Sequence, residues 1–170
     1  MKEDQKKIGK FVGVLLISYL IIYFMYEYLF VPHTGLDNYI IQSLLKLSAN
    51  LLELFHFDTF TDYQYAVIGI NGSSGVNVGY ACDGLSLFLL FSIFIAVFPG
   101  RKLFKAAYIF IGCLGIHLLN VGRIAALAII HLKEPSLLHF HHTYTFTILI
   151  YGIIFGLWVL RINIFTKKGW

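Results

Sequence analysis

Charged residues are scarce in this chain. Asp, Glu, Lys and Arg together make up 13% of its 170 residues, against about 25% in soluble globular proteins. Hydrophobic residues make up 58%, and the mean hydropathy is +0.76. Internal repeats and low-complexity tracts are also lacking. This composition excludes an ordinary soluble domain and predicts an integral membrane protein, organised as a single membrane domain over residues 1–170.

Four apolar runs, with their flanks, are long enough to cross a hydrocarbon core of about 30 Å, which takes about 20 helical residues. They predict an all-α membrane protein with four transmembrane helices, at about residues 11–30, 80–98, 106–132 and 144–162. The remaining long segment, residues 31–80, then lies outside the membrane between the first two spans.

Basic residues are rare on the outer side of these spans, which carries only Lys46 and Lys133. The opposite side holds many more: Lys2, Lys6, Lys7, Lys10, Arg101, Lys102, Lys105, Arg161, Lys167 and Lys168. The positive-inside bias therefore predicts that both termini are cytoplasmic, and the net charge of +4 indicates topology, with no nucleic-acid partner. The first run is too long for a secretion signal and lacks a small-x-small cleavage site, which predicts a retained anchor.

Cysteine is also rare, since the chain has only Cys82 and Cys113. We expect no disulfide between them, because Cys113 lies about two helical turns or more deeper in the membrane. Cys113 is typical of an apolar filler in the third span. Cys82 differs by its placement between Gly79 and Gly84, at the outer end of the second span. Asp83 alone would raise the pKa of the Cys82 thiol, so a thiolate needs a cation nearby.

Arg123 interrupts the third apolar run near its outer end. A guanidinium inside a span costs at least about 2.5 kcal/mol on insertion scales, so it faces protein or water and finds partners. Asn120 lies one helical turn earlier and His117 roughly another, which predicts an inward polar stripe. Two interpretations stay open. Arg123 either fixes a carbonyl or Asp83, or it is a cation that stabilises an oxyanion or lowers a thiol pKa.

Three histidines precede the last span: His139, His141 and His142. Histidine is the usual general base near neutral pH, and His142 is our first choice because it lies nearest the span, with His141 or His139 second. Metal binding and simple exposure in a loop are the alternatives. Three further histidines are interpreted as ordinary loop or interface residues: His33, His56 and His131.

The outer segment shows two further patterns. Apolar residues recur at near-helical spacing over Leu36–Phe55, among polar ones, which predicts an amphipathic helix on the outer surface. Residues alternate along Tyr63–Val67 and Val76–Tyr80 around the turn Asn71–Gly75, which predicts a β-hairpin whose return strand leads to Cys82. This outer segment is either a packed cap or a platform for an extended substrate peptide.

With these residues in place, the chain resembles the exosortase/archaeosortase family of membrane cysteine transpeptidases. The resemblance lies in Ala81–Leu85 before one span, Asn120–Ile124 within the next, and His142 before a final span that carries Gly152 and Phe155. It covers roughly the last ninety residues. The chain is compact beside the larger members, and Asp83 stands where the family often has a small or amide residue.

The resemblance implies a bacterial or archaeal cell-membrane enzyme that cleaves a C-terminal sorting signal of exported proteins at the outer face. It also implies transfer of the client to an envelope acceptor, an amine or an envelope lipid or glycan. Cys82 would be the nucleophile, Arg123 the oxyanion or thiolate stabiliser, and His142 the proton carrier, with Asn120, Asp83 and Gly84 in support. The partner is the C-terminal tail helix of the client, and we expect no cofactor and no metal.

Three other functions fit parts of the pattern. A small channel or transporter component would use the Arg123, Asn120 and His117 stripe as a polar path and would be indifferent to Cys82. A b-type haem carrier would need a histidine in another span facing His117 at matched depth, and the sequence offers none. A non-catalytic assembly factor would keep the fold without activity.

Overall fold

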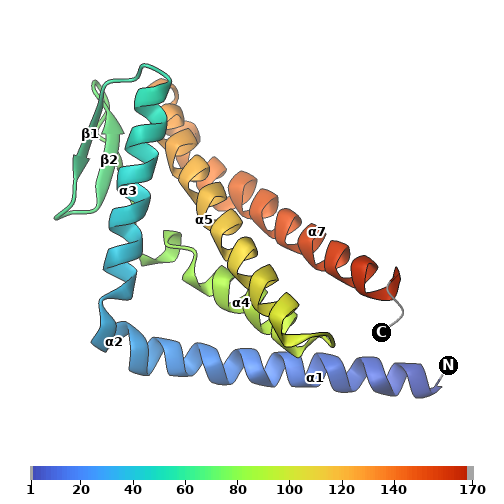
Figure 1. Cartoon of the computed structure of the whole chain (residues 1–170). Coiled ribbons are helices and arrows are strands. Elements are labelled where there is room, and N and C mark those ends of the chain that lie inside the picture. Colours follow the sequence, from blue (N-terminus) through green and yellow to red (C-terminus); the bar gives the residue numbers. More distant parts are fainter. Residues whose placement is uncertain (1, 168–170) are drawn as a thin grey trace. The chain divides into compact units, whose positions relative to one another are not determined.

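The computed structural model describes residues 2–167, and Lys168, one of the basic residues used to predict orientation, lies outside them. In chain order, the helices before the sheet are α1 (Lys2–Met25), a π-helical turn (Tyr26–Phe30), α2 (Val31–Thr34) and α3 (Leu36–Leu54). The sheet strands are β1 (Thr59–Asp62), β2 (Val67–Ile70) and β3 (Val76–Asn77). A 3₁₀ turn (Tyr80–Cys82), α4 (Leu85–Val97) and α5 (Lys102–Lys133) follow, and the chain ends with a 3₁₀ turn (Pro135–Leu137), α6 (Leu138–Phe140), a second π-helical turn (His141–Thr145) and α7 (Phe146–Lys167) (Figure 1).

Three helical segments are long and apolar enough to cross a membrane: Gly9–Tyr28, Lys102–Lys133 and Pro135–Asn163. They correspond to the first, third and fourth predicted spans. The second is shorter than predicted, because α4 has only 13 residues and reaches about 20 Å. The predicted helix fails before Leu85, where Gly84 adopts a φ of 83° that a right-handed helix cannot contain.

The chain forms two compact units. The first comprises the chain up to Thr34, Leu85–Leu114 and the part from Ile154 onward, and the second comprises Gly35–Gly84 and Gly115–Ile153. Helices α5 and α7 each contribute to both units. All residues predicted to carry the chemistry, from Cys82 to His142, belong to the second unit.

Aromatic rings hold the first unit together. Phe11 of α1 meets Phe94 of α4 edge to face at 5.9 Å between ring centroids, and Phe94 stacks on Trp158 of α7 at 4.3 Å. Arg161 is buried, and its Nη2 donates to the carbonyl oxygen of Pro99 at 3.5 Å. These contacts surround a buried cation with a carbonyl partner and aromatic neighbours.

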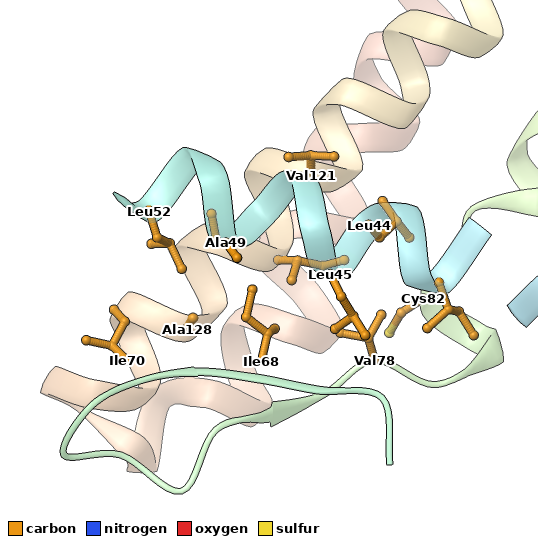
Figure 2. Close-up of a cluster of buried hydrophobic side chains, with 13 residues drawn as sticks. Leu44, Leu45, Ala49, Leu52, Ile68, Ile70, Val78, Cys82, Val121 and Ala128 are labelled. Atoms are coloured by element: carbon orange, nitrogen blue, oxygen red, sulfur yellow. The ribbon is translucent and has the colours of Figure 1, made fainter. Parts of the chain in front are cut away.

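The second unit is built on one face of α3. The helix begins after Gly35, in the left-handed conformation, and confirms the helix predicted over Leu36–Phe55. Its buried side chains recur at three- and four-residue spacing, as a helix packed on one side requires. They pack with residues of the sheet and of α5 in a core of Ile41, Leu44, Leu45, Ala49, Leu52, Ile68, Ile70, Val78, Cys82, Val121, Ile124, Ala125 and Ala128. Figure 2 shows Cys82 at one end of this cluster.

The predicted hairpin is present, with a third strand added to it. Strands β2 and β3 pair antiparallel, with Ile68 opposite Val76, and β1 pairs with the other side of β2, with Phe60 opposite Gly69. A side chain at Gly69 would collide with the Phe60 ring and with the Gly75 backbone. The sheet therefore needs glycine at this position because the ring lies directly over it.

The prediction of strand structure at Tyr63 and Tyr65 is wrong. The carboxylate of Asp62 accepts the backbone N–H groups of Gln64 at 2.9 Å and Tyr65 at 3.1 Å, which closes a turn between β1 and β2. An aspartate that accepts backbone N–H groups two and three residues ahead favours a turn over a continuing strand. The alternation seen in the sequence there belongs to a turn.

Candidate active site

Cys82 ends a tight turn that redirects the chain from β3 to α4. The Cys82 N–H donates to the carbonyl oxygen of Gly79 at 2.8 Å, which forms the 3₁₀ turn. Two residues later, the positive φ of Gly84 lets the chain reverse into α4, a conformation that disfavours any residue with a Cβ. Cys82 is a free thiol and is buried, with 8% of its surface exposed. Local backbone geometry therefore fixes where the sulfur can point.

Asn120 ties this turn to α5. Its Nδ2 donates to the carbonyl oxygen of Cys82, and only 1% of the Asn120 surface is exposed. The Oδ1 of Asn120 has no hydrogen-bond partner among the described residues. A buried hydrogen bond from a side-chain amide to a carbonyl is costly to break. Asn120 therefore holds the backbone of Cys82 in place.

His142 contacts the sulfur directly, with its Nε2 3.1 Å from Sγ of Cys82. It lies in the π-helical turn His141–Thr145 that precedes α7. Such a turn adds one residue to the helical repeat and so redirects the side chains on it. The neighbouring His141 instead places its Nδ1 3.1 Å from Oγ1 of Thr145, and His139 is exposed. Of these three histidines, His142 is therefore the one that the structure places in hydrogen-bond contact with the sulfur.

Arg123 approaches the same sulfur from α5, with Nη2 4.0 Å from Sγ of Cys82. It lies three residues after Asn120, on the same helix face. The Nε of Arg123 is buried and meets no acceptor in the part of the chain that the structure describes. The guanidinium therefore has donor capacity left beside the thiol.

The polar stripe of α5 continues at His117, which contacts α3. Its Nε2 lies 3.3 Å from Oγ of Ser43 on α3, and Ser48 on the same helix donates to the carbonyl oxygen of Val121 at 3.2 Å. The predicted stripe is thus divided between two tasks. His117 contacts α3, whereas Asn120 and Arg123 contact Cys82.

A family model of transmembrane exosortases matches residues 10–160 of the 170. The chain belongs to the transmembrane exosortase family. This confirms the resemblance drawn from Ala81–Leu85, Asn120–Ile124 and His142, and the match extends well beyond the last ninety residues. No curated protein and no solved structure matches the chain.

The thiol of this exosortase family member is enclosed by protein and lies between charges of both signs. The Arg123 guanidinium is 4.0 Å from Sγ, and Asp83, the next residue in the chain, is itself buried, with 4% of its surface exposed. A thiol becomes a strong nucleophile when it loses its proton, and His142 is in contact with it to accept that proton.

Two contacts between a histidine and a serine in this unit were not predicted from the sequence. Ser43, the partner of His117, was not singled out and is partly buried on α3. His131, interpreted as an ordinary loop or interface residue, has its Nε2 2.8 Å from Oγ of Ser74, which joins the β2–β3 turn to the end of α5. Neither contact involves Cys82. No group of three or more metal-binding side chains occurs within residues 2–167.

Proposed function

We propose that this protein is a membrane-embedded cysteine transpeptidase that cleaves a C-terminal sorting signal of exported proteins. One observation carries the proposal. The sulfur of Cys82 lies 3.1 Å from Nε2 of His142 and 4.0 Å from Nη2 of Arg123. A nucleophile, a proton acceptor and a fixed cation at these distances are the parts that acyl transfer through a thioester requires.

The membrane topology in this proposal has four passes with both termini cytoplasmic and the site at the outer face. The distribution of basic residues supports it. The short helix α4 and the turn before it together serve as the second pass. Non-helical backbone such as this turn is tolerated at membrane depth where protein encloses it. The cell membrane of a bacterium or archaeon is the proposed location.

The first half of the reaction forms a thioester. Sγ of Cys82 attacks the scissile carbonyl carbon while Nε2 of His142 takes the thiol proton, which requires the imidazole tautomer with its own proton on Nδ1. The guanidinium of Arg123 stabilises the negative charge on the tetrahedral oxygen. When the C–N bond breaks, His142 gives the proton to the leaving nitrogen, and the client remains bound to sulfur.

The second half releases the client. An acceptor amine, or another nucleophile on an envelope lipid or glycan, gives its proton to His142 as it attacks the thioester. Collapse of the second tetrahedral species breaks the C–S bond and returns the proton to sulfur. Water in place of the acceptor would yield hydrolysis. Asn120 contributes by holding the Cys82 carbonyl, and thereby the direction of Sγ, throughout both halves.

The test is the replacement of Cys82 by alanine, with Cys113→Ala as the matched control. Client proteins that end in a short motif, an apolar helix and a basic tail are followed by blotting. We expect unprocessed client in the Cys82→Ala strain and normal processing in the Cys113→Ala strain. Normal processing without Cys82 would refute the proposal, and dependence on Arg123 alone would instead indicate a channel or an assembly factor.

A further inference from the structure

β3 is an edge strand, since no other strand of the described residues pairs with its outer side, and it leads directly to the proposed nucleophile. The strand order is β1–β2–β3, and the Val78 N–H, just past β3, donates to the carbonyl oxygen of Ala66 at 2.7 Å. In an antiparallel pair, successive residues turn their N–H and C=O groups alternately toward the partner strand and away from it. With Val78 directed at β2, Asn77 and Gly79 direct their N–H groups away from it.

The two residues that carry the outward groups are exposed (Asn77) and partly exposed (Gly79), and they are held in place. Asn77 is exposed, and its side-chain Nδ2 donates to the carbonyl oxygen of Tyr65 at 2.7 Å. This contact fixes the strand without using the outward backbone groups. Gly79 continues the extended chain, with φ −77° and ψ 174°. The free edge thus comprises the N–H and C=O of Asn77 and the N–H of Gly79, and we call it the β3 edge.

The last residue of the β3 edge, Gly79, is hydrogen-bonded to Cys82. The carbonyl of Gly79, which accepts the Cys82 N–H at 2.8 Å, is part of the turn that carries the sulfur. A peptide strand bonded to the Gly79 N–H would therefore run beside Cys82. The opposite edge of the sheet is β1, which packs against α3 and lies on the far side of β2.

We propose that the β3 edge binds the client by strand addition, with the extended recognition motif of the client hydrogen-bonded to Asn77 and Gly79. This inference rests on the proposed function and names how its substrate is held. Backbone pairing suits an enzyme with several clients, because main-chain bonds supply affinity whatever the side chains are. It also holds the scissile segment extended beside Sγ, which attack on its carbonyl carbon requires.

Gly79 allows a test that removes a single outward donor. Proline has no N–H and prefers a φ of about −65°, close to the −77° of Gly79. Gly79→Pro therefore deletes this donor and keeps the carbonyl that accepts from Cys82. Val78, which precedes it, donates to Ala66 as a continuation of β3 would, and a residue before proline prefers such an extended backbone. Gly79→Ala is the matched control, since its Cβ would come no closer than 3.7 Å to Oδ1 of Asn77.

We expect client processing to be about tenfold or more lower in Gly79→Pro than in Gly79→Ala, because only the alanine variant keeps the N–H at this position. Alkylation of Cys82 by a small thiol reagent should be equal in both, which shows that the site itself is intact. Equal processing by the two variants, with Cys82→Ala still inactive, would overturn the β3 edge and leave the proposed function standing. Normal processing by Cys82→Ala would overturn both.

A second measurement covers the case in which Gly79→Pro does not accumulate. Tyr80 beside the β3 edge and Tyr63 in the β1–β2 turn are both exposed, at 64% and 50%, so either accepts a photoreactive phenylalanine. In the Cys82→Ala background, we expect the probe at position 80 to cross-link the recognition motif of the client and the probe at position 63 not to. Client cross-links from position 63 alone, or links only between two copies of this chain, would overturn the proposal.

Discussion

The two units of the chain each hold a cysteine and an arginine among apolar helices, but they surround them differently. In the first unit, Arg161 donates to a backbone carbonyl, and its Cζ lies 5.7 Å from the centroid of the Phe98 ring. The Sγ of Cys113 lies 3.5 Å from Oγ of Ser92. In the second unit, Arg123 and a histidine both approach the sulfur of Cys82. Residue type alone therefore does not distinguish a structural cysteine or arginine from a reactive one.

The difference lies in what each cation is used for. The contacts of Arg161 are with a carbonyl and an aromatic face, which are the usual ways of satisfying a buried guanidinium. Arg123 faces the sulfur of Cys82, and its Nε meets no acceptor among the described residues. A buried donor left in this state costs free energy, and its benefit would come when negative charge develops on the sulfur or on a substrate oxygen.

The largest effect should come from removing the proton carrier. His142→Gln keeps a side chain of similar polarity but cannot exchange a proton near neutral pH, so we expect processing to fall by about 10²- to 10⁴-fold. His139→Gln and His141→Gln are the controls and should process client almost normally. Client cleavage rates in membranes measure this, and a larger loss in either control would transfer the role to that histidine.

Substitutions of Arg123 and Arg161 should then affect different properties, activity for Arg123 and stability for Arg161. Arg123→Gln should slow processing by about 10²- to 10³-fold, because it removes charge stabilisation at the reacting oxygen. Arg161→Gln should lower the thermal stability of the purified protein, since it leaves the Pro99 carbonyl without this donor, and should keep the activity per folded molecule. Comparable activity losses per folded molecule would erase the distinction between the two units.

A smaller effect is expected at Asn120. Asn120→Ala leaves the buried Cys82 carbonyl without its donor, which should cost about 1–3 kcal/mol of stability and slow cleavage about tenfold as Sγ loses its direction. Ser48→Ala is the matched control, since it removes a donor to a carbonyl of α5 without touching Cys82. If thermal unfolding and cleavage rates change in the same proportion in both variants, Asn120 does no more than stabilise the fold.

The smallest effect is a change in the rate of thiol alkylation, measured in a Cys113→Ala background. Arg123→Gln should slow alkylation of Cys82 at neutral pH, because it removes a cation 4.0 Å from Sγ that favours the thiolate. Asp83→Asn should speed it, because it removes a negative charge from the neighbouring residue. Equal alkylation rates in both variants and in the parent would mean that neither charge acts on the sulfur.

Much of this arrangement was predictable from the sequence. The helix over Leu36–Phe55 followed from the spacing of its apolar residues, and the hairpin followed from the glycine-rich turn at Asn71–Gly75. Periodicity and turn chemistry are local, so they are visible in a single sequence. Strand β1 was missed because its four residues Thr59–Asp62 show too little alternation and acquire their partner only when β2 lies beside them.

The site was predicted in part. That Cys82, Arg123 and a histidine would gather on one side followed from the order of the spans. The choice of His142 for contact with sulfur depends on the π-helical turn at His141–Thr145, and no residue pattern indicated that turn. The bond from Asn120 to the Cys82 carbonyl joins residues 38 positions apart, and its existence depends on how α5 packs.

The sequence by itself determined that this protein belongs in a membrane, and it indicated which residues meet in one compact unit. Apolar runs must avoid water and basic residues must stay out of lipid, and both requirements act on each segment separately. What only the tertiary structure decided is which atoms touch: Nε2 of His142 on the sulfur, Arg123 beside it, and Asn120 on the carbonyl. Contacts of a few ångströms depend on turns, helix packing and side-chain rotamers that several distant segments set together.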